Sequence, residues 1–297
     1  MERMISLGAM SQDRLDASLD IDRQPAREIV RIIQDEDRRV AEAVAAEAER
    51  IAHAVDQIAE RLEHGGRLFY AGAGTSGRIA MLDASELPPT YGISPELVQV
   101  LMAGGVNAFF SAAEGAEDDE EAAVEAVNAK VTADDAIVGI ATSGTTPFTV
   151  AAVRRANMLG ALTVGVTSAP GSPLAHDVDI AIVARTGAEV IMGSTRMKSG
   201  TAQKLILNTI STGVMVRLGR VYSNLMIEMP ATNEKLRSRA VRMVELAAGV
   251  TRPIAVQAIR EADGNVKLAT VMAKKHVSAD EARRLLDGRP LREVLEQ

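Results

Sequence analysis

The string Gly72-Ala-Gly-Thr-Ser-Gly-Arg78 follows a short apolar run and is the first place in the chain where chemistry is concentrated. Gly74 and Gly77 let a backbone come close to an anion, and free N–H groups at a helix start point toward it. Thr75 and Ser76 add hydroxyl donors. The string predicts a phosphate-binding loop that opens a helix. It also fits the G-x-G-x-x-G pattern of dinucleotide folds, and a tight turn with hydroxyl caps is the plainest alternative.

A second string, Thr142-Ser-Gly-Thr-Thr146, also lies between an apolar run and a helix, whose first residue is expected to be Pro147. Two hydroxyl-rich loops at the carboxyl edge of one parallel sheet fit a compact phosphate better than a dinucleotide. The residues expected to contact the ligand here are Ser143, Gly144, Thr145 and Thr146.

A third cluster, Gly193-Ser-Thr-Arg-Met-Lys198, precedes a long apolar helix. It adds hydroxyl groups and two cations, and we expect Ser194 and Lys198 to contact the ligand. The chain lacks a Walker A string, which disfavours an ATP-dependent kinase.

Two carboxylates are candidates for acid–base chemistry. Glu86 is expected at the end of the helix that begins at Ser76, where two prolines follow and stiffen the segment. Glu117 lies in an acidic run, in which a solvated surface role is the common one. Metal and thiolate chemistry are disfavoured, because the chain has no Cys and its four His show no ligand spacing. We therefore expect neither a metal nor a cofactor.

The composition excludes several other classes of function. Aromatic residues make up 2% of the 297 residues and Trp is absent, so a stacking platform for bases is not expected. The net charge of −7 argues against binding to nucleic acids or anionic membranes. No apolar run reaches the roughly 18 residues that a membrane span needs, and no signal peptide is evident. A cytoplasmic location is consistent with these features.

Hydrophobic periodicity predicts the elements that hold these loops. Residues 1–25 are expected to form an irregular arm, followed by two amphipathic helices up to Glu63. Five strands are predicted, at 68–71, 97–102, 136–141, 162–166 and 180–184. Helical stretches at 76–87, 107–130 and 146–159 separate them, and a long helix includes 205–218. This alternation predicts an α/β three-layer sandwich around a mainly parallel sheet.

Three segments follow from this pattern. The N-terminal arm and helices occupy 1–50, the phosphate-binding α/β domain 51–231, and a small C-terminal helical domain 232–297. The breaks at Gly264, Ser278 and Gly288 suggest three helices in the last segment.

The motifs in series closely resemble those of N-acetylmuramic acid 6-phosphate etherases, a family of the sugar isomerase (SIS) superfamily. The strings, in chain order, are GAGTSGR, DASELPPTYG, EGAEDD, ATSGTTPF and GSTRMKSGTAQK. The resemblance runs from about Ile21 to the C-terminus. The N-terminal arm departs from it, with Ser11-Gln-Asp-Arg-Leu-Asp16 in place of a TE-x-R-N-like string and Gln34 where Asn is common.

The resemblance implies an SIS-type fold and a lyase that recycles cell-wall amino sugars. Such an enzyme releases D-lactate from N-acetylmuramic acid 6-phosphate, works as a homodimer without a metal, and uses two glutamates that map onto Glu86 and Glu117. We assign Glu86 to protonation of the lactyl oxygen and Glu117 to the C2 proton or the added water. The alternatives are a sugar-phosphate-responsive regulator, a phosphosugar isomerase and a dinucleotide-dependent oxidoreductase.

Overall fold

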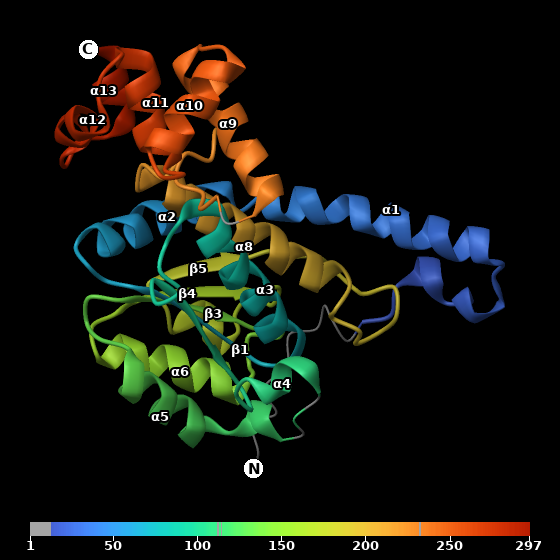
Figure 1. Ribbon diagram of the computed structural model, residues 1–297. Helices are drawn as coiled ribbons and strands as arrows, with labels where there is room; N and C mark the ends of the chain where they lie inside the picture. Colours follow the sequence, from blue (N-terminus) through green and yellow to red (C-terminus); the bar gives the residue numbers. More distant parts are fainter. Residues whose placement is uncertain (1–12, 112, 114, 232) are drawn as a thin grey trace. The chain divides into compact units, whose positions relative to one another are not determined.

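The computed structural model describes residues 13–111, 113, 115–231 and 233–297 (Figure 1). The chain forms two compact units, and each is described by itself. The first runs to Ala84 and resumes from Glu96 to Gly213, whereas the second comprises Ser85–Pro95 and Val214–Gln297. The predicted division at residues 50 and 231 stays a prediction. Residues 1–12 of the predicted arm lie outside the described residues, and the arm's remainder contains two 3-10 turns, η1 (Asp16–Ser18) and η2 (Ile21–Arg23).

A five-stranded sheet forms the centre of the first unit. Its order is β2-β1-β3-β4-β5, and all neighbouring strands are parallel. The strands are β1 (Leu68–Gly72), β2 (Val98–Met102), β3 (Ala136–Ile140), β4 (Leu162–Thr167) and β5 (Ile180–Val183). The inner strands β1, β3 and β4 are buried along their whole length, because helices cover both faces of a parallel sheet. The prediction of five strands in a parallel sheet is confirmed.

Helices cover the two faces of this sheet as a three-layer sandwich predicts (Figure 1). On one face, α5 (Glu120–Lys130) packs against β2, and α6 (Pro147–Met158) packs against β1, β3 and β4. On the other, α2 (Ala48–Glu63) packs against β4 and β5. The short α7 (Pro173–His176) lies beside β4 and β5. The three-layer α/β fold class is therefore confirmed.

A buried polar network ties α3 (Gly74–Tyr91) and α8 (Lys198–Arg217) to β1. The Tyr70 hydroxyl on β1 donates to Asp83 Oδ2 on α3 at 2.8 Å. Asn208 Nδ2 and Ser211 Oγ on α8 both donate to Asp83 Oδ1, at 2.6 and 3.1 Å. Burial, reinforced by the neighbouring Asp83, raises the pKa of Tyr70 well above its usual value. Because it is neutral and hydrogen-bonded, Tyr70 can be fully buried between these elements.

The two predicted amphipathic helices before the sheet are confirmed as α1 (Ala26–Ala45) and α2. The single helix predicted over 107–130 is wrong. The described part of that segment forms α4 (Asn107–Phe110), the 3-10 turn η3 (Ala116–Asp118) and α5. Gly115 precedes the turn with a φ of +73°, which a continuous helix does not permit. The Asp119 side chain then accepts a hydrogen bond from Ala122 N and caps α5.

The prediction that a helix ends at Glu86 is also wrong, because α3 continues through Pro88 and Pro89 to Tyr91. Each proline removes one intrahelical N–H donor, but its fixed φ still suits the last turns of a helix. Gly92 closes the helix by donating its N–H to Pro88 O at 2.9 Å, with a φ of +62°. Glu86 therefore stands within a helical turn and not beyond it.

The second unit contains a small helical bundle, as predicted. From residue 233 to the C-terminus the described residues form five helices and not the expected three: α9 (Glu234–Ala248), α10 (Arg252–Glu261), α11 (Val266–Lys275), α12 (Ala279–Leu286) and α13 (Leu291–Glu296). One overlooked break is Gly249, whose φ of +69° ends α9. Across the described residues, none of the helices has the length and apolar character to cross a membrane.

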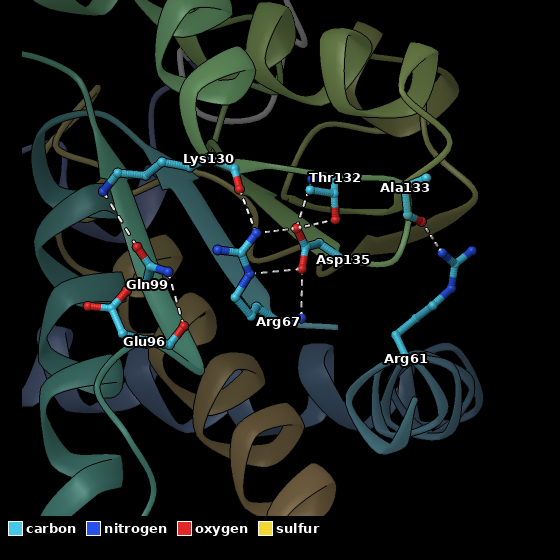
Figure 2. A network of polar contacts seen from close by, with 8 residues as sticks. All are labelled: Arg61, Arg67, Glu96, Gln99, Lys130, Thr132, Ala133 and Asp135. Carbon is cyan, nitrogen blue, oxygen red and sulfur yellow. Dashed lines mark hydrogen bonds and ion pairs between the residues drawn. The ribbon is translucent and has the colours of Figure 1, made fainter. Parts of the chain in front are cut away.

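The amino ends of β1 and β3 are joined by an arginine–aspartate clamp, Arg67 with Asp135 (Figure 2). Arg67 Nε and Nη2 donate to Asp135 Oδ1 and Oδ2 at 3.1 and 2.8 Å. The backbone N–H groups of Arg67 and Thr132 also donate to this carboxylate, each at 2.8 Å. Burial raises the pKa of Asp135, but these hydrogen bonds outweigh burial and leave its pKa below the ordinary value.

Replacing Asp135 by Asn is expected to lower the free energy of unfolding at pH 7 by about 3 kcal/mol, because the pair is broken and Asp135 is 1% exposed. A lowered carboxyl pKa stabilises the fold fully above pH ~4, and the contribution is lost as pH falls through the folded-state value. The gap between wild type and variant should therefore narrow toward pH 2. Urea denaturation at pH 7 and at pH 2 measures this difference in the free energy of unfolding. A difference below about 1 kcal/mol at pH 7 would contradict a stabilising role of the clamp.

Candidate active site

A cavity of about 470 Å³ opens at the carboxyl ends of β1 and β3, and we call it the hydroxyl pocket. The loops that follow these strands form most of its wall, because the carboxyl ends of adjacent parallel strands meet at one sheet edge. Its hydroxyl groups come from Thr75, Ser76, Thr142, Ser143, Thr145, Thr146 and Thr195. Glu117, Asp118 and Gly74 complete its polar and backbone surface. The predicted convergence of the two hydroxyl-rich loops is thus seen in the structure.

The loop after β3 holds its hydroxyl groups in a fixed arrangement. Ser143 Oγ accepts hydrogen bonds from Thr145 N at 3.2 Å and Thr145 Oγ1 at 3.0 Å, so its own O–H can donate to a ligand. Gly144 has a φ of +64°, and a Cβ there would lie 2.0 Å from Ser172 Oγ. Only glycine fits this turn, although Gly144 does not itself line the pocket.

Two helices begin at the hydroxyl pocket. The N-terminal residues of α3, Gly74 to Ser76, line it, and α6 begins at Pro147 in its wall. The first N–H groups of a helix have no intrahelical partner, and together with the helix dipole they attract anions. Gly77 does not line the pocket. A Cβ on Gly77 would lie 2.8 Å from Gly72 O, so the glycine at this position permits the close packing of α3 against β1.

In the third predicted cluster, the residue that lines the hydroxyl pocket is not one of the two that were expected to contact the ligand. Thr195 lines the hydroxyl pocket, whereas Ser194 and Lys198 do not. Lys198 is 2% exposed, and its Nζ donates to Glu36 Oε2 on α1 at 2.6 Å. The N–H groups of Lys198 and Ser199, at the start of α8, both donate to the buried Glu189 carboxylate at 3.0 Å. This helix start is therefore already occupied by an anion of the protein, and substrate binding by Lys198 stays a prediction.

A second cavity of about 350 Å³, which we call the alanine cavity, adjoins the first. It shares Ala73, Gly74 and Glu117 with the hydroxyl pocket, so Glu117 stands at their junction. Arg78 supplies its positive charge, and the rest of the wall consists of Ala103, Ala108, Ala113, Gly115 and Ala116. Glu117 itself is exposed.

Glu86 lies on the part of α3 that belongs to the second unit, and its side chain is exposed. Its partnership with Glu117 therefore stays a prediction. The residues missed by sequence reasoning are Thr142, Thr195 and Asp118, although each belongs to a string that was singled out. Within the described ranges, no three His, Cys, Asp or Glu side chains gather in a way that could hold a metal ion.

Comparison with known proteins identifies the family. The model named "SIS domain" matches residues 109–212, and "Glucokinase regulatory protein N-terminal SIS domain" matches 50–157. The phosphoheptose isomerase from Francisella tularensis superposes with a TM-score of 0.51 at 20% identity, covering 65% of this chain and 100% of that one. This likeness supports the fold alone.

Closer relatives are curated proteins named N-acetylmuramic acid 6-phosphate etherase. The one from Symbiobacterium thermophilum is 55% identical over 88% of this chain and 87% of its own length. The one from Clostridium beijerinckii is 50% identical over 97% of this chain and 95% of its own length. With such identity over nearly the whole of both sequences, and with the SIS fold around the hydroxyl pocket, this chain belongs to the N-acetylmuramic acid 6-phosphate etherase family.

Proposed function

We propose that the hydroxyl pocket holds the 6-phosphate of the sugar on which this protein acts. The protein is a carbon–oxygen lyase that cleaves the D-lactyl ether of N-acetylmuramic acid 6-phosphate. The products are N-acetylglucosamine 6-phosphate and D-lactate, and the reaction serves the recycling of cell-wall amino sugars. The observation that carries the placement of the phosphate is the convergence of two helix starts and two hydroxyl-rich loops on one cavity.

The reaction needs an acid and a base but no redox step. In the open-chain sugar the C1 aldehyde acidifies the C2 proton. A base takes that proton, the electron pair forms the C2–C3 double bond, and the C3–O bond breaks. An acid protonates the departing lactate oxygen, because an alkoxide is a poor leaving group. Water then adds its oxygen at C3 while C2 is reprotonated, which gives N-acetylglucosamine 6-phosphate.

Two carboxylates can perform these transfers. We assign Glu117 to the C2 proton and the added water, because it stands at the junction of the two cavities. We assign Glu86 to the lactate oxygen, on the strength of its place in the SELPPT string and of the resemblance. The phosphate ligands we propose are Ser76, Ser143, Thr145 and Thr146, with Thr75, Gly74 and Thr195 beside them.

Replacing Ser143 by Ala tests the phosphate site. The expected result is a loss of affinity for N-acetylglucosamine 6-phosphate of about 10-fold or more, since one hydrogen bond to a charged group is removed. The melting temperature should fall by only a few degrees, because Ser143 is not a helix cap and the variant loses only the two hydrogen bonds from Thr145. Calorimetric titration and thermal denaturation separate the two effects, and unchanged affinity with lowered stability would assign Ser143 a structural role.

The activity itself is tested by incubating the full chain with N-acetylmuramic acid 6-phosphate and measuring free D-lactate. Release in many turnovers is expected. A sugar-phosphate-responsive regulator, which the match to the glucokinase regulatory protein model keeps as the alternative, would bind the sugar and release none. No D-lactate at stoichiometric enzyme would refute the lyase.

We also propose a cytoplasmic homodimer, on the strength of the resemblance and of a chain without Cys. Light scattering coupled to size-exclusion chromatography should give twice the chain mass of 31.5 kDa. A monomer at micromolar concentration would contradict the dimer.

A further inference from the structure

We propose that Arg78 binds the carboxylate of the lactyl group inside the alanine cavity and thereby selects an acidic ether substituent. The inference rests on the proposed function. The substrate has two anionic groups, the 6-phosphate and the lactyl carboxylate. The hydroxyl pocket accounts for the first, and the alanine cavity offers a cation for the second.

The Arg78 guanidinium is fixed by the backbone around α4. Nε donates to Phe109 O at 3.1 Å, and Nη2 donates to Ala108 O and Ser111 O at 2.9 and 3.3 Å. These acceptors are neutral carbonyls, so they orient the side chain without cancelling its charge. The entropy of ordering a long side chain is therefore lost on folding and need not be lost when a ligand binds.

The charge of Arg78 has no carboxylate partner among the described residues. Its hydrogen bonds to described residues come from Nε and Nη2, so Nη1 has no acceptor among those residues, although the side chain is half-buried. A half-buried cation with unused donors is a strong site for a carboxylate, because charged hydrogen bonds are about twice as strong as neutral ones.

The cavity around Arg78 has the space for a short, branched acid. Apart from Glu117, its remaining wall is built from alanine and glycine residues, and Gly104 beside it is already crowded, since an added Cβ would lie 2.7 Å from Ala113 Cβ. Small residues leave the volume of about 350 Å³ open while keeping an apolar surface for a methyl group. A lactyl group presents one methyl and one carboxylate, which matches this wall.

The position of Glu117 connects the two anion sites. It lines both cavities. A sugar that has its phosphate in the hydroxyl pocket and its lactyl group beside Arg78 would therefore lie across the Glu117 carboxylate, which is assigned to the C2 proton. Arg78 is thus a specificity-determining residue that also holds the scissile ether near the base.

The test compares Arg78→Gln with wild type on N-acetylmuramic acid 6-phosphate and on its lactyl carboxamide analogue. Wild type should prefer the acid in kcat/KM by about 10- to 100-fold, the value of a charged hydrogen-bonding pair. Arg78→Gln should lose this preference, with KM for the acid raised by a similar factor. Affinity for N-acetylglucosamine 6-phosphate, which lacks the lactyl group, should change less than threefold. Arg78→Lys should recover part of the preference.

Arg61→Gln is the matched control, because Arg61 also donates to a backbone carbonyl, Ala133 O at 2.5 Å (Figure 2), but lines neither cavity. Its preference for the acid should equal that of wild type. If active wild type does not distinguish acid from carboxamide, or if Arg78→Gln weakens both sugars equally, the assignment of Arg78 is overturned while the lyase stands. Absence of D-lactate with wild type would instead overturn the proposed function.

Discussion

Replacing Glu117 by Gln is expected to lower kcat for D-lactate release by roughly 10²- to 10⁴-fold, the usual contribution of one general acid or base. Glutamine keeps the shape of the side chain but cannot accept the C2 proton. Glu86→Gln should cause a loss of similar size by another route, since the lactate oxygen would leave unprotonated. Glu121→Gln is the matched control, because Glu121 is an exposed member of the same acidic run and lines neither cavity.

Deuterium exchange separates the two roles. With Glu86→Gln in D₂O, the base is intact, so solvent deuterium should enter C2 of the substrate without lactate release. With Glu117→Gln, neither exchange nor release should be seen. Mass spectrometry of recovered substrate measures this. Wild-type turnover by Glu86→Gln would remove that residue from the mechanism, and exchange by Glu117→Gln alone would reverse the two assignments.

Replacing Lys198 by Met is expected to lower the free energy of unfolding by about 3 kcal/mol, because the buried Glu36 carboxylate then keeps only Arg39, an exposed partner at 3.1 Å. Both side chains of the Lys198–Glu36 pair are almost inaccessible, at 2% and 5% exposure, and their atoms are 2.6 Å apart. A second carboxylate, Glu189, binds the backbone of the same helix start.

The double variant Lys198→Met with Glu36→Gln provides the control for this prediction. It also removes the buried charge of Glu36, so it should recover at least half of the lost stability in urea denaturation. If Lys198 instead held the substrate, Lys198→Met would raise KM by 10-fold or more at an unchanged free energy of unfolding. That outcome would restore the sequence-based expectation for this residue.

The sheet and most of the hydroxyl pocket could be predicted because they depend on local patterns. Strands buried on both faces are continuously apolar, and the loops that follow parallel strands must gather at one edge. The positions of Thr75, Ser76 and Ser143 at the pocket follow from that rule. The rule applies equally to Thr142 and Thr195. Both lie in strings that were predicted to bind the ligand, but neither was named as a contacting residue.

The rest depended on contacts that no local pattern shows. Lys198 donates to Glu36 on α1, which precedes it by 162 residues, and no local pattern predicts that contact. The break in 107–130 depends on Gly115, in a segment whose composition otherwise favours a helix. The prolines after Glu86 were interpreted as a stop, but a helix tolerates them where its end is close and Gly92 can close it.

The clamp between Arg67 and Asp135 lies at the amino ends of the strands, whereas the hydroxyl pocket lies at their carboxyl ends. The five residues of β1, each rising by roughly 3.3 Å along the strand, lie between the clamp, which stabilises the fold, and the pocket, to which the chemistry is assigned. Directed evolution toward a heat-resistant enzyme can therefore work on the amino edge of the sheet with little penalty in turnover. Libraries aimed at new ether substituents can in turn vary the wall around Arg78 while a reinforced amino edge absorbs the destabilisation that such changes bring.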